Sequence, residues 1–246
     1  MSIETEYELD AMIRVGSAVA AARDAMLAAV RPGISTLELD RIGESMLAAR
    51  GCRSAPRLAY GFPGSTCVSV NDALAHGIPS ADQVLRSGDV VNVDVSAELG
   101  GFWADTGAST AVGTVGTRTE RLLAETRAAL SDAIAVARPG VRLSEIGRVI
   151  ERRARRAGLR VVRDLSGHGV GRHIHEDPVV PNHYDPKDRT RLHEGLVITI
   201  EPFFTLGSDR VIEDEDGWTL RTGDGSVGAQ FEHTIVITDQ DALILT

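Results

Sequence analysis

Cysteine is scarce in this chain, and its scarcity excludes a disulfide-stabilised fold. Only two cysteines, Cys52 and Cys67, occur among 246 residues, and one pair cannot build the disulfide framework of a small secreted protein. The N-terminal segment is acidic and lacks the apolar core of a signal peptide. We therefore expect a reducing compartment, the cytoplasm, in which both thiols stay free.

Long apolar runs and an excess of basic residues are also missing. No segment approaches the roughly 20 apolar residues that span a bilayer. The net charge of −9 disfavours nonspecific nucleic-acid binding, which needs a basic surface. One basic run, Glu151–Arg160, is typical of a solvated helix face. The sequence therefore predicts a protein that binds neither a membrane nor a nucleic acid.

The residues that are present fit a globular protein with a substantial core. Hydrophobic residues make up 43% of the chain and are interleaved with charged ones. Apolar residues recur at helical spacing from Glu6 to Val30, and a capping-box pair, Ser35 and Glu38, begins a second helix that ends at Gly51. The β-branched runs that follow predict strands joined by tight turns.

The chain contains an internal repeat. The segment RPGISTLELDRI, which begins at Arg31, resembles RPGVRLSEIGRV, which begins at Arg138. The same displacement aligns VVNVD, ending at Asp94, with VITIE, ending at Glu201. Each half is therefore expected to form two helices followed by part of a sheet.

The repeat also predicts the domain organisation. No Pro/Gly/Ser-rich linker separates the copies, so we expect one pseudo-symmetric domain over residues 1–246, with halves of roughly 31–110 and 138–246. In the second copy Arg142 stands where Ser35 caps the first helix. That helix must begin without the same capping box.

Acidic residues at matching places in the repeat indicate a metal site. Asp94 and Glu201 each end a run that reads as a buried strand, where an ionised carboxylate is costly unless it is paired or bound to metal. Each alone also fits a strand-end residue that faces water. Asp105 follows Asp94 by the length of a hairpin, and Glu232 opens the last β-branched run. With His168 these acids form an oxygen-rich set that favours Mn²⁺, Fe²⁺ or Co²⁺ and admits Zn²⁺. Five groups suit two metal ions about 3.5–4 Å apart.

A histidine-rich stretch, Ser166–Pro178, tests a different metal motif. The pair His175-Glu176 begins like the H-E-x-x-H motif of zinc peptidases. The residue four places after His175 is Val179, and Pro178 would break the helix that this motif needs. We therefore exclude the zinc-peptidase helix and expect the other ligands to come from elsewhere in the chain.

Six short motifs follow one another along nearly the whole chain: HGIP, VNVDV, ADTG, GHGVGRHIHEDP, TIEP and QFEHTI. In this order and spacing they resemble the type I methionine aminopeptidases of the pita-bread fold. The resemblance implies an α+β protein in which a pseudo-two-fold repeat forms a central antiparallel sheet covered by helices. It also implies a monomeric, cytoplasmic enzyme that removes the N-terminal methionine from nascent proteins and peptides and contacts ribosomes transiently.

The resemblance implies a role for each metal ligand. Asp94 would chelate one ion with both oxygens, and Asp105 and Glu232 would bridge the two ions. His168 and Glu201 would complete the coordination of the other ion. The cofactor would be two divalent ions, Co²⁺, Mn²⁺, Fe²⁺ or Zn²⁺.

Three residues are implied to act in catalysis. Glu201 would accept a proton from the attacking water and later give it to the leaving amine. His76 and His175 would not bind metal but would contact the scissile amide and stabilise the tetrahedral intermediate. Gln230 and Thr199 are candidates for orienting Glu232 and Glu201, although both also fit ordinary polar positions in strands.

The implied methionine pocket departs from the family pattern in places. Its expected lining residues, besides the two catalytic histidines, are Phe62, Cys67, Ile174 and Trp218. Ile174 stands where family members often carry an aromatic residue, and Ala59 occupies the family's tyrosine position, with Tyr60 displaced by one place. Cys67 could instead be a nucleophile, but no activating histidine lies beside it in sequence.

Two other functions remain open at this point. An enzyme of the same fold that cleaves X-Pro bonds is one alternative, although such relatives usually add an N-terminal domain. A non-catalytic binding module is the other, although such modules have typically lost ligands that this chain keeps. A metal assay and a methionyl-peptide hydrolysis assay would separate these functions.

Overall fold

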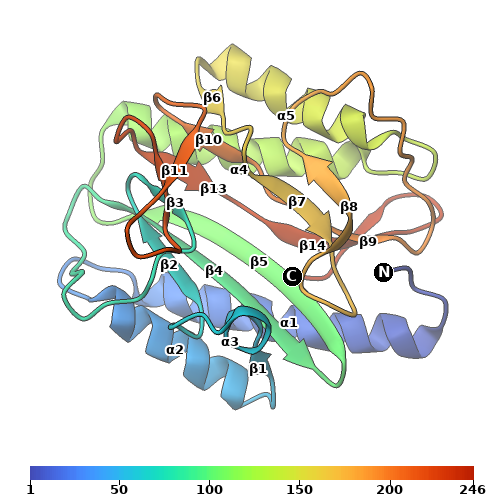
Figure 1. The fold of residues 1–246 in the computed structure, drawn as a ribbon, viewed down its shortest axis with the longest axis horizontal. Helices are drawn as coiled ribbons and strands as arrows, with labels where there is room; N and C mark the ends of the chain where they lie inside the picture. The colour runs from blue at the N-terminus through green and yellow to red at the C-terminus, as the bar shows by residue number, and fades with distance from the viewer.

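The computed structural model describes residues 1–246 as strands flanked by two pairs of helices. One pair is α1 (Glu6–Ala29) and α2 (Thr36–Ala48), and the other is α4 (Thr117–Val136) and α5 (Leu143–Ala157). The pairs lie at the bottom and the top of the view in Figure 1, with the strands between them. None of these helices is long and apolar enough to cross a membrane.

The first two helices begin as the sequence predicts. Ser35 accepts a hydrogen bond from the backbone N–H of Glu38, and the Glu38 carboxylate accepts one from the Ser35 N–H. Thr5 and Glu8 form the same capping box at the start of α1. At the start of α5, Arg142 makes no side-chain cap, because arginine offers only donors and the free groups at a helix start are also donors.

The first half of the chain forms a four-stranded sheet in which β4 pairs with β1, β2 and β5. The strands are β1 (Arg53–Ser54), β2 (Cys67–Val70), β4 (Val90–Leu99) and β5 (Phe102–Ala111). The β4–β5 pair is the predicted hairpin, and its register sets Asp105 opposite Ser96. Asp94 therefore lies in the middle of a long strand, opposite Cys67.

The second half forms a five-stranded sheet in the order β15-β14-β9-β7-β8. Its strands are β7 (Ser166–Gly169), β8 (Glu176–Pro181), β9 (Val197–Ile200), β14 (His233–Ile237) and β15 (Ala242–Ile244). His168 belongs to β7, Glu201 directly follows β9, and Glu232 directly precedes β14.

Two smaller sheets complete the fold. One contains β6 (Arg160–Val161), β10 (Phe203–Thr205) and β13 (Gly228–Gln230). The other contains β3 (Ala73–Ala75), β11 (Val211–Glu213) and β12 (Leu220–Thr222). The β11–β12 hairpin brings Trp218 back toward β3. Every strand pairing is antiparallel.

The two large sheets meet along β5. An isolated bridge joins Ala108 to Phe231, and the backbone N–H of Glu232 donates to the carbonyl of Gly107 at 2.8 Å. A short junction thus joins the two large sheets, and β3 of the first half also pairs with β12 of the second half, whereas the sequence predicts one shared central sheet. This junction lies between the acids of β4 and β5 and those of β9 and β14.

Each helix pair covers its own apolar core. One cluster joins α1 and α2 to β4 and β5 and includes the fully buried Met12, Met26 and Val93. The other joins α4 and α5 to β9 and β14 and includes Ile146 and Ile198. The α+β class, with antiparallel strands covered by helices, is confirmed.

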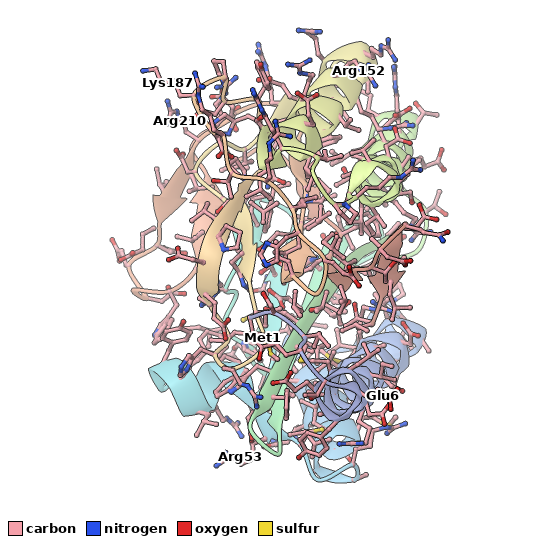
Figure 2. All side chains as sticks on the ribbon, turned by 90° about the vertical axis from the view of Figure 1, so that its right-hand side faces the viewer. Met1, Glu6, Arg53, Arg152, Lys187 and Arg210 are labelled. Carbon is pink, nitrogen blue, oxygen red and sulfur yellow. The ribbon has the colours of Figure 1, made fainter.

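The basic run at the end of α5 is a solvated helix face, as the sequence predicts. Arg152, Arg155 and Arg156 are exposed, whereas Ala154 between them is buried. Arg152 stands at the end of the molecule opposite Arg53 (Figure 2).

Candidate metal centre

A cavity of about 980 Å³ opens where the two large sheets meet. Its wall includes all the residues predicted to bind metal or to act in catalysis: His76, Asp94, Asp105, His168, His175, Glu201 and Glu232. The four residues predicted to line a side-chain pocket are also in this wall: Phe62, Cys67, Ile174 and Trp218. The fold therefore gathers into one cavity residues that lie far apart in the sequence.

Three side chains at the centre of the cavity are arranged as a metal-binding group. One ligand atom each from Asp105, His168 and Glu232 lies within 4.8 Å of the others, and all three residues are buried. Glu201 Oε1 lies 3.7 Å from His168 Nε2, and Asp105 Oδ2 lies 3.9 Å from the same nitrogen. Asp94 lines the same cavity, where burial, and then the charge of Asp105, raise its pKa. All five predicted ligands therefore converge.

The hydrogen bonds of the site leave two carboxylate oxygens without partners. Asp105 Oδ1 and Glu232 Oε1 are buried and accept no hydrogen bond. A buried, unsatisfied carboxylate oxygen is costly in the absence of a cation. Oxygen donors with one imidazole are the ligand set of borderline divalent ions such as Mn²⁺, Fe²⁺ and Co²⁺. These residues therefore fit a divalent metal.

Burial strongly changes the ionisation of these groups. Desolvation, and then neighbouring carboxylates, raise the pKa values of Asp94, Glu201 and Glu232 well above their usual range. Desolvation raises the pKa of Asp105 to about 6. It lowers the pKa of His168 to about 3, so this imidazole is neutral and has a lone pair to give. Bound cations would restore the ionised form of the acids.

The protein orients these ligands through a second set of contacts. His168 Nδ1–H donates to the carbonyl of Gly169 at 2.9 Å, which leaves Nε2 as the ligand atom. The Oγ1 of Thr199 accepts the backbone N–H of His168 at 3.0 Å. The side chains of Gln230 and Thr199 also oppose the rise of the Glu201 pKa, and the Gln230 amide donates to Glu232 Oε2 at 3.0 Å. Both residues thus contact predicted ligands.

Asn92 belongs to this second set, and sequence reasoning missed it. Its Nδ2 donates to Gln230 Oε1 at 2.8 Å. That bond turns the amide nitrogen of Gln230 toward Glu232 Oε2, to which it donates at 3.0 Å. Asn92 precedes Asp94 by two residues in the VNVDV motif, and residues at this spacing lie on the same face of a strand. This shared face is the one feature of the sequence that points to a role for Asn92 in the site.

The side-chain pocket beside the metal ligands has an apolar wall. Phe62 and Trp218 meet edge to face with ring centroids 5.2 Å apart, and Ile174 is buried nearby. Burial, and then the charge of Asp94, raise the pKa of the Cys67 thiol well above its usual range. The thiol is therefore protonated, which argues against Cys67 as a nucleophile.

The loop that carries Ile174 and His175 is held by Glu176. The Oε1 of Glu176 accepts the backbone N–H groups of Arg172 and His173, at 2.5 and 2.7 Å. Its other oxygen pairs with the ammonium group of Met1, which lies on this face of the molecule (Figure 2). His173 also lines the cavity.

Tyr60 lines the cavity. The sequence did not predict this, because Tyr60 stands one place away from the family's tyrosine position. It is the last residue of α3 (Ala55–Tyr60), and its hydroxyl is hydrogen-bonded to Nδ1 of His175. Gly61 follows with φ 70° and ends the helix. The chain then returns to place Phe62 in the pocket.

Comparison with known proteins identifies the family. The model of metallopeptidase family M24 matches residues 10–239. The chain belongs to metallopeptidase family M24. It is 44% identical to methionine aminopeptidase 2 of Bacillus subtilis, over 100% of this chain and 99% of that protein. It is 41% identical to methionine aminopeptidase 1 of Mycobacterium tuberculosis, over 97% and 92% of the two chains.

Solved structures of M24 proteins have the same fold. The methionine aminopeptidase of Thermotoga maritima superposes with a TM-score of 0.97 at 38% identity, covering 100% of this chain and 99% of that one. The prolidase of Pyrococcus furiosus gives 0.78 at 23% identity, and the match covers only 65% of its chain. The pita-bread fold expected from the sequence is confirmed, and the prolidase likeness concerns the fold alone.

Proposed function

We propose that this M24 protein is a methionyl aminopeptidase, which removes the N-terminal methionine from nascent proteins and peptides. The observation that carries the proposal is the convergence of Asp94, Asp105, His168, Glu201 and Glu232 in one cavity, in a chain that matches methionine aminopeptidases over its whole length. A binding module would not need this complete donor set.

Two divalent ions are the proposed cofactor. Asp94, Asp105, His168, Glu201 and Glu232 would hold the ions, with Asp105 and Glu232 as the proposed shared ligands. When bound, such ions lower the pKa of a coordinated water, bind the free amine of the substrate and polarise its carbonyl. The two partnerless oxygens and the neutral His168 support this assignment. Mn²⁺, Fe²⁺, Co²⁺ and Zn²⁺ are the candidate ions.

The chain's own residues move the proton and hold the substrate. Glu201 accepts a proton from the attacking water and gives it to the leaving amine, a role that its place in the cavity wall beside His168 supports. His76 and His175 donate hydrogen bonds to the scissile amide. The wall formed by Phe62, Cys67, Ile174 and Trp218 accepts a methionine side chain, because a flexible thioether suits an apolar pocket.

We further propose that residues 1–246 act as one catalytic domain. The cavity draws residues from both halves of the chain, so neither half alone would hold the ions. We expect a cytoplasmic monomer whose partners are polypeptides with an N-terminal methionine, together with transient ribosome contact.

The decisive experiment uses metal-stripped protein. The tripeptide Met-Ala-Ser and an X-Pro peptide are incubated with it after Mn²⁺, Co²⁺, Fe²⁺ or Zn²⁺ is added back separately. We expect metal-dependent release of methionine from Met-Ala-Ser. Cleavage of the X-Pro peptide alone would assign the alternative specificity, and metal binding without hydrolysis of either peptide would favour the binding module.

A further inference from the structure

Tyr60 and His175 come from distant parts of the chain and meet at the mouth of the cavity. Tyr60 ends α3, whereas His175 lies in the loop between β7 and β8. The Tyr60 hydroxyl is hydrogen-bonded to His175 Nδ1, and the two rings lie 5.6 Å apart at an angle of 40°. Tyr60 is 51% exposed, so a packing requirement alone does not account for its position.

We infer that Tyr60 is a positioning residue for His175: its hydroxyl donates to Nδ1 and thereby holds the imidazole in the tautomer that carries hydrogen on Nε2. The expected effect on catalysis rests on the proposed function. The hydrogen bond and the tautomer of His175 do not depend on it.

The direction of the bond follows from the chemistry of the two groups. A neutral imidazole has one N–H donor and one acceptor nitrogen, and a phenol can serve as either partner. Phenol O–H is the more acidic donor, and burial followed by the charge of Asp105 raises the pKa of Tyr60, so the hydroxyl keeps its proton. Donation from Tyr60 to Nδ1 is therefore favoured.

The bond to Tyr60 occupies one of the two ring nitrogens of His175. His175 belongs to the same cavity wall as the predicted metal ligands. With Nδ1 occupied by Tyr60, Nε2–H is the group left to donate.

Other contacts fix the backbone around His175 but not its ring nitrogens. Glu176 binds backbone N–H groups of the loop, and the His168 ring packs edge to face against His175 with centroids 4.3 Å apart. Neither contact distinguishes Nδ1 from Nε2. Among the hydrogen bonds of this structure, only that from Tyr60 reaches a ring nitrogen of His175.

The consequence is a donor placed for the substrate. An Nε2–H can donate to the oxygen of the scissile amide and more strongly to the oxyanion that forms from it. A lone pair at the same place would repel that oxygen. Loss of the hydroxyl should therefore slow turnover and leave methionine binding almost unchanged.

The first test compares Tyr60→Phe with Tyr7→Phe, which removes the same hydroxyl from a residue that is 66% exposed in α1. We expect Tyr60→Phe to lower kcat for Met-Ala-Ser about tenfold, the scale of one hydrogen bond near 1.4 kcal/mol, with KM changed less than about twofold. Tyr7→Phe should match the wild type.

A double-mutant cycle asks whether Tyr60 acts through His175. In the His175→Ala background, Tyr60→Phe should cause no further loss of kcat, because the residue that it positions is gone. An equal tenfold loss in both backgrounds would mean that Tyr60 contacts the substrate independently, and the inference would be wrong.

A second readout needs no activity. Histidine ¹⁵N and ¹H NMR of the metal-free protein reports which ring nitrogen of His175 is protonated. We expect Nε2–H in the wild type and a mixture of tautomers in Tyr60→Phe. An Nδ1–H tautomer in the wild type, or spectra unchanged by Tyr60→Phe, would overturn the inference. If the metal-loaded wild type released no methionine while the NMR result held, the proposed function would fail and the tautomer assignment would stand.

Discussion

At the scale of single residues, Glu232 shows how a binding site conflicts with stability. One of its oxygens is buried without a hydrogen-bond partner, and burial together with three neighbouring acids raises the pKa of its carboxyl. Such an arrangement is unfavourable in the empty protein and becomes favourable only with a cation.

We predict opposite effects of Glu232→Gln on binding and on stability. The amide keeps the shape but loses the charge, so Mn²⁺ affinity by calorimetry and methionine release should fall by on the order of 100-fold or more. The metal-stripped variant should melt at a higher temperature than the metal-stripped wild type, because one repelling charge is removed. Glu194→Gln, at an exposed position, is the control and should change none of these quantities. A variant with normal metal affinity would exclude Glu232 as a ligand.

The sequence predicts the residues of this site better than their contacts. The five predicted ligands all reach one cavity, because their motifs and their places in the repeat are local properties of the chain. Tyr60 and Asn92 were missed as contacts because their partners, His175 and Gln230, are distant in sequence. Such pairs are fixed only by the tertiary fold.

At the scale of elements, the helices differ in whether a side chain caps their N-terminus. α1 and α2 each have a complete capping box, whereas α5 begins at Arg142 with no side-chain cap. Helix starts are readable from sequence because a cap involves only four consecutive residues. The division of the strands into separate sheets was not predicted, because it depends on where distant strands stop pairing.

Arg142→Ser should stabilise the protein. Arg142 is exposed and has the extended backbone of an N-cap (φ −79°, ψ 143°), and Glu145 already occupies the third helical position. Serine would complete a capping box and add about 0.5–1 kcal/mol to the free energy of unfolding. Urea unfolding measures this gain. Arg142→Ala is the matched control and should give no comparable increase.

Gly147→Ala should destabilise α5 although alanine favours helices. A Cβ at Gly147 would lie 2.1 Å from the backbone carbonyl oxygen of His183, which cannot move without shifting the chain that follows β8. We expect a loss of about 2–3 kcal/mol. Gly43→Ala in α2 is the comparison, because its nearest neighbour is the flexible Met26 side chain. Equal losses from both substitutions would contradict this explanation.

At the scale of the whole molecule, the metal centre joins two separately packed cores. Asp94 and Asp105 lie on strands that pack with α1 and α2, whereas Glu201 and Glu232 border strands that pack with α4 and α5. Ion binding at the proposed centre would therefore link the two halves, and its removal should weaken the junction between them.

The metal-stripped protein should lose stability as pH rises from about 4 through about 6. The pKa of Asp105 is raised from 3.8 to about 6 in the folded state, so in this window the folded protein retains a proton that the unfolded chain has lost. The retained proton on Asp105 stabilises the folded protein fully below the unfolded pKa of 3.8, and this stabilisation is lost as pH rises through the folded pKa of about 6. The other acids with raised pKa values extend the loss of stability to higher pH. Urea unfolding from about pH 4 to about pH 8 measures the slope.

Two comparisons isolate the cause of this slope. Asp105→Asn should flatten it, and added Mn²⁺ should reverse it, because metal and protons compete for the same oxygens. A metal-stripped wild type with the same profile as Asp105→Asn would show that Asp105 is not responsible.

The order of the ligands along the chain has a consequence for biosynthesis. Asp94 is made first and Glu232 last, and Glu232 pairs with Gly107 through its backbone only once β14 exists. A growing chain that stops short of β14 holds an incomplete set of donors. Under the proposed ligand assignment, each new molecule would gain its activity only as its translation finishes.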